Sequence, residues 1–327
     1  LDPVNATPIY KDLLSPEWMH AVNSYIELHG MYRFADDIVW GETLKRFRNG
    51  VPLPSDFVYI NERVVGLNGL TRDGDAIPHD ISYATPRNKE RDAINAGIFS
   101  KILERNAVPT IAIFSDKLCV KKLGESKYTP VTNSLFWEEC GESDCIFKAR
   151  TTRLDPVLKL YIGCPLLLNE NIDLDNRLAN GTQAVLVKVV LKSGESTSEV
   201  LVNGILIKAV FASQVSYLLL RHAPKDGKAG SEFKMKAKKF SGFSAMMPRP
   251  AELRGKSKKI KMTFSANQLP VVVNNATTGH KLQGCTKKNI FVNCFSYAKN
   301  WPYVVLSRVK TRKGLYLRLP LDESKDY

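Results

Sequence analysis

One short segment near the C-terminal end of the chain concentrates side chains that can bind phosphate oxygens. Between Thr277 and Gly284 the sequence offers hydroxyl, imidazole, ammonium and amide groups, on Thr278, His280, Lys281 and Gln283. Hydroxyl and cationic donors of this kind contact the phosphates of nucleic acids. A lone histidine is more often a packed or solvated residue, so the meaning of the segment depends on the elements that position it.

The pattern around this segment predicts alternating strands and helices. The expected elements are a buried strand at Leu269–Val273, a polar loop at Asn274–Gly279, a helical turn at His280–Gln283, a strand at Ile290–Val292, a helix opened by Asn300-Trp301-Pro302 that runs through Tyr303–Lys310 to a stop at Gly314, and a strand at Leu315–Leu319. Ligands bind at the carboxyl ends of the strands in an open α/β sheet. The topology therefore places Thr277–Gly284 at a binding edge.

The first half of the chain is also mixed. The predicted elements there are helices at Glu17–Glu27, Asp36–Arg48 and Glu90–Leu103, strands at Ile81–Thr85 and Thr110–Phe114, and a strand run at Leu158–Leu168 that Gly163 and Pro165 interrupt. From Gly181 to Tyr217 the pattern becomes all-β, with Val-rich strands at Gln183–Leu191, Glu199–Val202 and Ile205–Val210 joined by short Gly turns. Such a unit inside an alternating chain indicates an inserted small barrel or meander.

The composition favours a folded, polyanion-binding protein. Hydrophobic residues make up 44% of the 327 residues, which is enough for a sizeable core. The formal net charge is +14, and the segment Arg221–Lys261 carries 13 Lys and Arg against three acids. A solvated basic loop would explain that charge run alone. The interleaved aromatic and Met residues suit a nucleic-acid contact better; they are Phe233, Phe240, Phe243, Met246 and Met247.

Several other classes of protein are excluded by the same counts. No run of 18 apolar residues occurs, so a membrane-spanning helix is not expected. The six Cys are too scattered for a disulfide scaffold, and Cys140 and Cys145 lack the further ligands of a zinc site, so we expect no metal ligands and reduced thiols. An intracellular protein, nuclear or mitochondrial, fits this cysteine use and charge. The chain starts at Leu1 without Met and is expected to be part of something longer.

Two C-terminal segments resemble motifs of superfamily-one DNA helicases. Ala276–Thr286 is similar to motif V, most closely in the Pif (petite integration frequency) branch and in Helitron-type transposon helicases, and Tyr303–Lys310 with Gly314-Leu315 resembles motif VI. Looser similarities cover most of the remaining chain. They are Ile26–Phe34 with motif IV, Thr85–Asn95 with the strand-to-helix motif after it, and Leu158–Pro165 with Asn171 and Asn180–Thr182 at the entry to the family's inserted barrel.

The resemblance implies an α/β fold: a RecA-like, P-loop-NTPase-type second motor lobe without its own P-loop, which carries an inserted small all-β barrel of the Src-homology-3-like kind. It divides the chain into a helical lead-in at 1–75, a first part of the lobe at 76–168, a basic β-rich insertion at 169–266 and a second part of the lobe at 267–327. Where the family usually has a β-branched or apolar residue, this chain has Gly279, which we expect to loosen the loop before His280.

The resemblance also implies roles for individual residues. Phosphoryl transfer needs positive charge on the γ-phosphate oxygens, and an arginine from a second lobe can supply it. Arg308 is the candidate finger, held on the motif VI helix, and Arg33 is the possible second one. Gln283, Gly284 and Arg308 would face the nucleotide, and DNA would meet Thr278, His280, Lys281, Asn88 and Lys89.

A nucleotide-binding loop of the form G-x-x-x-x-G-K-[ST] does not occur in the sequence. The single Gly-Lys-Ser, at Gly255–Ser257, has Pro250 where the first Gly should stand, and Asp36-Asp37 is a poor magnesium ligand because it is expected on a helix. ATP and Mg²⁺ would then be held mainly by an N-terminal RecA-like lobe of the same protein, and this chain alone would be inactive.

The implied activity is an ATP-dependent DNA helicase that moves 5′-to-3′ and unwinds duplex DNA, with roles in DNA repair, recombination and telomere maintenance. Its partners would be single-stranded or duplex DNA and the N-terminal lobe, and no membrane. One alternative is a non-catalytic nucleic-acid-binding remnant of a transposon or viral helicase. A third reading, a protein-interaction barrel with a decayed motor lobe, fits the intact motifs around His280 and Arg308 less well.

Overall fold

The structure is a computed structural model that describes most of the chain. The described residues are 32–79, 81–122, 127, 129–130, 157–171, 178–202, 204–222, 232–235, 238–241, 243–254, 262–283, 285–295 and 301–324. The helix predicted at Glu17–Glu27, the pair Cys140 and Cys145, and most of the motif IV-like segment lie outside these ranges, as do residues 223–231 and 255–261 of the basic segment.

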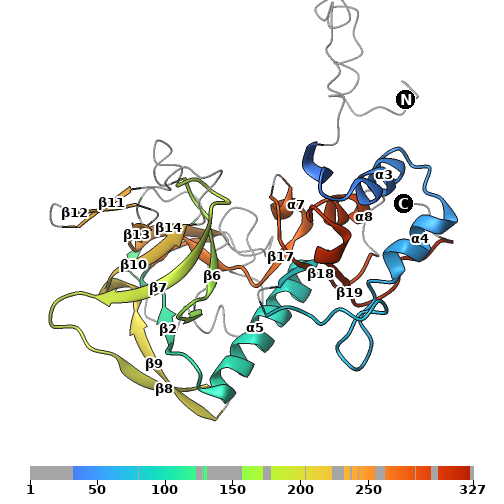
Figure 1. Ribbon diagram of the computed structural model, residues 1–327. Coiled ribbons are helices and arrows are strands. Elements are labelled where there is room, and N and C mark those ends of the chain that lie inside the picture. The colour runs from blue at the N-terminus through green and yellow to red at the C-terminus, as the bar shows by residue number, and fades with distance from the viewer. Residues whose placement is uncertain are drawn as a thin grey trace, which may run out of the picture.

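A four-stranded parallel sheet forms one part of the molecule (Figure 1). Its strands stand in the order β17 (Ala276–Thr278), β1 (Ser82–Thr85), β18 (Ile290–Val292) and β19 (Leu315–Leu317). The helices of this part are α3 (Ile38–Arg48), α4 (Pro54–Asn61), α7 (Gly279–Leu282) and α8 (Trp301–Leu306), with short 3-10 turns η1 (Tyr32–Phe34) and η3 (Arg312–Gly314). Their apolar faces share one core with the sheet, which includes Trp40, Leu44, Ile290, Val305 and Leu317.

The second part is β-rich. A five-stranded sheet has the order β13 (Phe243–Met246), β10 (Val215–His222), β7 (Gln183–Leu191), β6 (Pro165–Leu168) and β16 (Val271–Val273). A four-stranded sheet has the order β5 (Val157–Tyr161), β2 (Thr110–Phe114), β9 (Ile205–Phe211) and β8 (Ser198–Val202).

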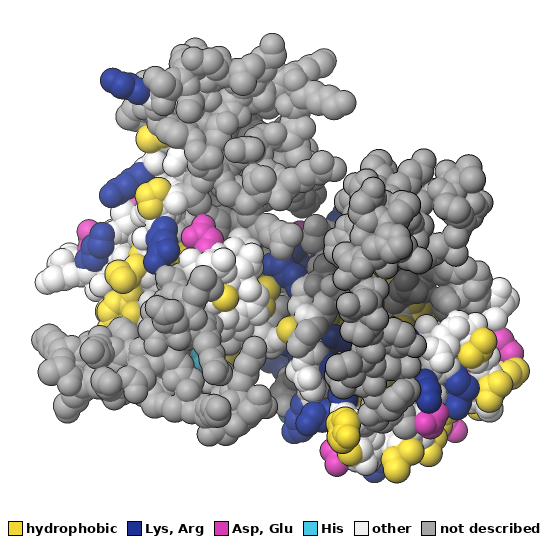
Figure 2. Space-filling model, turned by 90° about the horizontal axis from the view of Figure 1, so that it is seen from above, with side chains coloured by type: hydrophobic (Ala, Val, Ile, Leu, Met, Phe, Trp, Pro, Cys, Tyr) yellow, Lys and Arg dark blue, Asp and Glu magenta, His cyan; other side chains and the backbone are white. Residues whose placement is uncertain are grey.

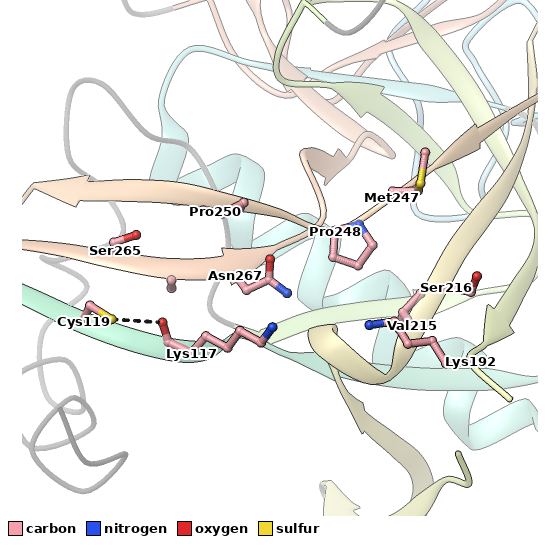
Figure 3. A pocket seen from close by; sticks show the side chains of 11 residues that line it. Lys117, Cys119, Lys192, Val215, Ser216, Met247, Pro248, Pro250, Ser265 and Asn267 are labelled. Atoms are coloured by element: carbon pink, nitrogen blue, oxygen red, sulfur yellow. Dashed lines mark hydrogen bonds between the residues drawn. The ribbon is translucent and has the colours of Figure 1, made fainter. Parts of the chain in front are cut away.

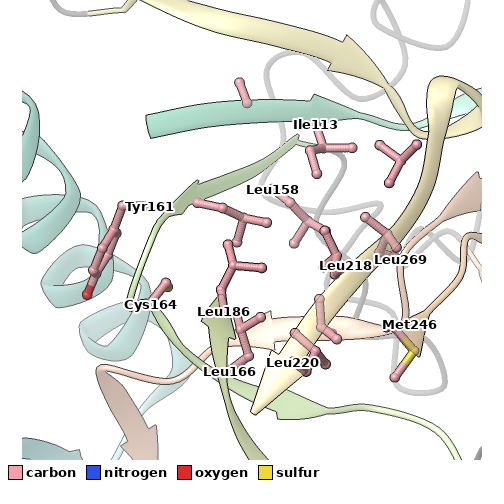
Figure 4. Packing of buried hydrophobic residues seen from close by; sticks show 14 of the residues in the cluster. Ile113, Leu158, Tyr161, Cys164, Leu166, Leu186, Leu218, Leu220, Met246 and Leu269 are labelled. Atoms are coloured by element: carbon pink, nitrogen blue, oxygen red, sulfur yellow. The ribbon is translucent and has the colours of Figure 1, made fainter. Parts of the chain in front are cut away.

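A third sheet and a hairpin complete this part. The sheet runs β14 (Arg249–Arg254), β15 (Met262–Gln268), β3 (Asp116–Lys122) and β4 (Thr129–Pro130), and β11 (Glu232–Met235) pairs with β12 (Lys238–Ser241). A 3-10 turn, η2 (Ala212–Gln214), links β9 to β10. The buried side chains of the β-rich part form a second core, in which Ile113, Leu158, Leu186 and Leu218 pack together (Figure 4).

Helix α5 (Asn88–Arg105) connects the two parts (Figure 1). Its middle packs against β1 and β17, while Phe99 and Leu103 belong to the core of the β-rich part. The helix ends at Asn106, whose φ of 45° is left-handed, a conformation that Asn tolerates at a helix C-terminus. Because α5 contacts strands of the parallel sheet and also contributes side chains to the core of the β-rich part, it ties the two parts together.

Most predicted elements are confirmed. The strands expected at Ile81–Thr85, Thr110–Phe114, Gln183–Leu191 and Ile290–Val292 are β1, β2, β7 and β18, and the helix expected at Glu90–Leu103 starts two residues earlier, at Asn88. Asp36-Asp37 precedes α3 instead of lying on it, and Asp37 accepts a bond from Trp40 N as the N-cap. Within the described ranges, no helix combines the length and the apolar character needed to cross a bilayer.

The stretch Leu269–Gly279 was predicted correctly only in part. The strand expected at Leu269–Val273 is present as β16, but it pairs antiparallel with β6, and the strand of the parallel sheet is the next one, Ala276–Thr278, inside the expected polar loop. The apolar run Val271–Val273 is typical of a buried strand. The residues Ala276, Thr277 and Thr278 are typical of a loop, although all three are buried. The chain crosses between sheets at Asn274 and Asn275, which are both buried.

Strands β2 and β5 stand in one sheet with β9, so this sheet crosses a domain boundary inferred from the sequence. They come from the expected first part of the RecA-like lobe, at 76–168, yet β2 is parallel to β9 of the expected insertion and antiparallel to β5. The parallel sheet therefore draws its described strands from 82–85 and from 276–317 only.

Candidate functional site

Two arginines that lie 275 residues apart in the sequence meet at the loop between α7 and β18. Arg33, in η1, donates from Nη2 to the carbonyl of Cys285 (3.1 Å), to Thr286 Oγ1 (3.3 Å) and to the carbonyl of Arg308 (3.4 Å). Arg308 donates from Nη1 to the carbonyl of Leu282 (3.0 Å). Arg33 is therefore bonded to this loop, and Arg308 to the end of α7 directly before it.

The pair forms a concentrated positive charge. Both side chains are half-buried, and burial together with the neighbouring Arg33 holds the pKa of Arg308 below its usual value. Among the described residues neither arginine has a carboxylate partner, and the Nε atoms of both are buried without a hydrogen-bond acceptor. A buried N–H group without an acceptor is costly, so this arrangement favours an anion that would accept from it.

Arg308 lies on a turn, not on the predicted helix. Helix α8 ends at Leu306, because Val309 forms a parallel bridge with Lys287 and the Lys287 amide donates to the carbonyl of Arg308 (2.9 Å). A residue in this bridge has extended backbone, so the helix cannot continue to Val309. Arg308 Nη2 then donates to Ser307 Oγ (2.7 Å), which fixes the guanidinium beside the end of α7.

Gly279, the first residue of α7, packs closely against Trp301, whereas we expected it to loosen the loop. A Cβ on Gly279 would overlap the six-membered ring of Trp301, the first residue of α8. The indole of Trp301 therefore occupies the space that a side chain at position 279 would need. Leu282, at the other end of α7, supplies the carbonyl that binds Arg308, so the packing of α7 bears on the position of that arginine.

The remaining nucleotide-facing candidates follow α7. Gln283 is exposed and is the C-cap of the helix, directly after Leu282. Gly284 lies outside the described residues, and so does the side chain of His280. Lys281 is half-buried between them. The structure therefore brings Arg33, Arg308 and Gln283 to one end of α7.

The DNA-binding candidates lie at the carboxyl edge of the parallel sheet. Thr278 ends β17 and precedes α7, and its Cα partner across the ladder is Thr85, which ends β1. Thr278 is only 9% exposed, so it presents little surface to a ligand. Asn88 and Lys89 are exposed in the first turn of α5, which follows β1. Thr85, which sequence reasoning did not single out, shares this edge because it is the last residue of a parallel strand.

A separate hollow of about 530 Å³ lies in the β-rich part (Figure 3). Its lining comes mainly from β3, β10 and β15 and includes the side chains of Lys117, Lys192 and Asn267. Figure 2 shows Lys and Arg side chains spread over the face seen from above. Sequence reasoning assigned no role to this hollow, and none of its lining residues touches the arginine pair.

No family model matches the sequence, and no curated protein matches it either. Solved structures do match. The crystal structure of Pif1 helicase from Candida albicans superposes with a TM-score of 0.59 and 16% identity, over 96% of this chain and 60% of that one. Pif1 helicase from Bacteroides in complex with ADP-AlF3 and ssDNA gives a TM-score of 0.52 and 14% identity, over 91% of this chain and 52% of that one.

A further match has the same TM-score of 0.52 at 14% identity; it is a structure of DNA unwinding at forked dsDNA by two coordinating Pif1 helicases. This chain spans 50% to 60% of the length of the three proteins. At such identities the likeness concerns the fold. The chain has the mixed α/β fold, with a parallel sheet, of Pif1 helicases.

Proposed function

We propose that this chain is the arginine-supplying portion of a Pif1-type, ATP-dependent DNA helicase. The convergence of Arg33 and Arg308 on one loop, without a carboxylate among the described residues to neutralise them, carries the proposal. The fold shared with Pif1 helicases supports it, and so do the motif V and motif VI similarities at Ala276–Thr286 and Tyr303–Lys310.

In this proposal the two arginines act on the terminal phosphate of ATP. Charge develops on the γ-phosphate oxygens during transfer, and a prepositioned guanidinium stabilises it. Such arginine fingers contribute about 10³- to 10⁵-fold in rate. Arg308 has a free Nε–H and is fixed through Leu282 and Ser307, while Arg33 holds the loop from the other side. Gln283 would contact the nucleotide from the end of α7.

The described residues do not fit Mg²⁺. The metal is bound in proteins through carboxylates and phosphate oxygens. The groups around the arginine pair are guanidiniums, backbone carbonyls and the hydroxyls of Thr286 and Ser307. We therefore assign Mg²⁺ and the remainder of ATP to a separate P-loop lobe, and this chain to the opposite side of the nucleotide.

DNA would lie along the carboxyl edge of the parallel sheet, beside Thr278, His280, Lys281, Asn88 and Lys89. The Bacteroides neighbour was solved with ssDNA and ADP-AlF3, which makes the same pair of ligands reasonable here. Because α7 begins directly after Thr278 and ends at Leu282, it joins the proposed DNA edge to the arginine pair. Lobe closure on ATP and opening after hydrolysis would then shift the strand, 5′-to-3′ as the resemblance implies.

The domain division is part of the proposal. The parallel sheet with α3, α4, α7 and α8 would be the RecA-like lobe, and the β-rich sheets would be the inserted Src-homology-3-like barrel. Because β2 pairs with β5 on one side and with β9 on the other, we shift the start of the insertion to the end of α5. A Helitron origin and a nuclear or mitochondrial location stay predictions.

The test uses the chain and an Arg308→Ala variant, with Lys310→Ala as a control of equal charge change at an exposed position two residues away. Inorganic triphosphate, titrated by calorimetry, is expected to bind the chain and to lose about tenfold or more in affinity in Arg308→Ala, with little change in Lys310→Ala. Fluorescently labelled oligo-dT should bind all three proteins similarly. ATP hydrolysis, with or without oligo-dT, should be absent.

Each outcome decides one part of the proposal. Equal losses of triphosphate affinity in both variants would reduce the arginine pair to general surface charge. DNA-stimulated ATP hydrolysis by the chain alone would contradict the division of the nucleotide site between lobes. Binding of oligo-dT without any triphosphate binding would favour the alternative, a non-catalytic nucleic-acid-binding remnant.

A further inference from the structure

A single glutamine side chain joins the β-rich part to the loop that holds both arginines. Gln183 is the first residue of β7, and its Nε2 donates to Cys285 Sγ (3.3 Å) while its Oε1 accepts from Lys287 Nζ (2.8 Å). These partners lie 102 and 104 residues away in the sequence. The amide thus spans a gap between two sheets and uses both its donor and its acceptor.

The two residues that Gln183 holds are the residues that position the arginines. The carbonyl of Cys285 accepts from Arg33, and the amide of Lys287 donates to the carbonyl of Arg308. A shift of this loop would therefore move the acceptor of one arginine and the donor that fixes the other. The four bonds connect β7 to the candidate site along two branches, one through Cys285 and one through Lys287.

The chemistry of the amide suits this place. Lys287 is half-buried, and burial lowers its pKa while the neighbouring Cys285 acts in the opposite sense. Gln183 accepts from the Lys287 amine without bringing negative charge near Arg33 and Arg308. A carboxylate at the same position would also accept from Lys287. Its negative charge, however, would offset part of the positive charge that attracts an anionic ligand.

The strand that carries Gln183 leads toward the basic segment Arg221–Lys261. Strand β7 pairs with β10, and its second residue, Ala184, is the Cα partner of His222, near the start of that segment. A polyanion bound at β10 would act on β7 through this ladder, and on the arginine loop through Gln183.

We propose that Gln183 is a positioning residue that couples the β-rich sheet to the Arg33–Arg308 pair through Cys285 and Lys287. The inference rests on the proposed function for its meaning, but its structural core, the control of the loop by Gln183, can be tested apart from it.

Hydrogen exchange on the full chain tests that core. Gln183→Leu removes both bonds of the amide, and exchange at the Lys287 amide should become about tenfold faster, the change expected from losing roughly one to two net hydrogen bonds. Gln214→Leu is the matched control, because the Gln214 amide also bonds at both ends, to Glu195 and Phe211, but within the β-rich part. Core amides of β10 should exchange at unchanged rates in both variants.

Triphosphate titration then connects the loop to the site. Gln183→Leu is expected to lower the affinity for inorganic triphosphate about three- to tenfold, by the loss of the same bonds. Gln183→Glu should retain slow exchange at Lys287, since it still accepts from that amine, yet weaken triphosphate binding by added negative charge. Should Gln183→Leu fail to fold, Lys287→Met removes the same contact from the other side.

The outcomes separate the two claims. If Gln183→Leu and Gln214→Leu give the same exchange at Lys287, Gln183 does not position the loop and the inference is wrong. If exchange responds as expected but the unmutated chain binds no triphosphate, the coupling stands and the proposed function fails. If triphosphate binds, and Gln183→Leu loosens the loop without affecting affinity, the positioning role is overturned.

Discussion

Gly279 lies flat against the indole of Trp301, so closely that a Cβ on the glycine would overlap the ring. The ring is held from its other end, because Trp301 Nε1 donates to the carbonyl of Cys294 (2.9 Å). Helix α7 and helix α8 therefore meet without a side chain between them. This contact fixes the distance between α7 and α8. It therefore also positions the carbonyl of Leu282, which accepts a hydrogen bond from Arg308.

Gly279→Ala should accordingly destabilise the chain. The added methyl has to displace a buried indole, and overpacking of that kind costs about 1–3 kcal/mol. Urea unfolding should show a lower midpoint. Gly97→Ala is the control, since Gly97 lies within α5 with open space around its Cα, and there Ala should stabilise by about 0.5–1 kcal/mol.

The substitution Trp301→Leu should relieve the overlap between the methyl group of Gly279→Ala and the indole of Trp301. If the Gly279–Trp301 contact is the cause, the combined Gly279→Ala and Trp301→Leu variant will be more stable than the sum of the single effects predicts. Strict additivity of the two changes in unfolding free energy would contradict the contact as the source of the cost.

Acid should weaken the chain through Asp56. Burial alone would raise the pKa of this carboxyl, but bonds from Arg46 (2.5 and 2.8 Å), Leu53 N (2.9 Å) and Thr43 hold its pKa below the usual range. The folded-state pKa is thus below the unfolded value of about 3.9, so the stabilisation is present above that pH and is lost as the pH falls through the folded value.

Asp56→Asn measures that contribution. At pH 7 the variant should be about 2–3 kcal/mol less stable in urea, and at pH 3 the difference from the unmutated chain should shrink. Glu323→Gln, an exposed carboxylate with no such partners, should show little difference at either pH. A gap for Asp56→Asn that is the same at both pH values would refute the assignment.

Lys89 should contribute to single-stranded DNA binding through charge alone. Its exposed ammonium, in the first turn of α5 at the carboxyl edge of the sheet, would contact a phosphate. Lys89→Ala should weaken oligo-dT binding for all base compositions and lower the slope of log affinity against log salt by about 0.7. Lys101→Ala, further along the same helix and also exposed, should leave the slope unchanged.

Cys164 should be chemically inert in the folded chain. Its side chain is fully buried in the β-rich core, and burial raises the pKa of the thiol to about 12. Iodoacetamide at pH 8 should label the partly exposed Cys119, Cys285 and Cys294 before Cys164, as read by peptide mass spectrometry. Labelling of Cys164 before unfolding would show that this core opens readily.

The sequence pattern predicted an element correctly where the residues of that element alone determine whether it is a helix or a strand. The alternation and branched content of Gln183–Leu191 gave a strand with the same ends, and the apolar spacing along Glu90–Leu103 gave α5 within two residues at each end. At Val271–Val273 the pattern predicted a buried strand correctly but not the sheet that it joins, and it missed the strand at Ala276–Thr278, whose residues are typical of a loop. Helix α8 was predicted too long because its end depends on the distant Lys287.

The amino-acid sequence by itself determined the basic charge, the strands and helices, and the loop whose Thr, His, Lys and Gln suit phosphate. Those are properties of near neighbours along the chain. Only the tertiary structure decided that Arg33 lies beside Arg308, that Trp301 fills the space over Gly279, and that Gln183 holds Cys285 and Lys287. These contacts join residues far apart in the sequence, and sequence spacing carries no information about distances that packing of the two cores sets.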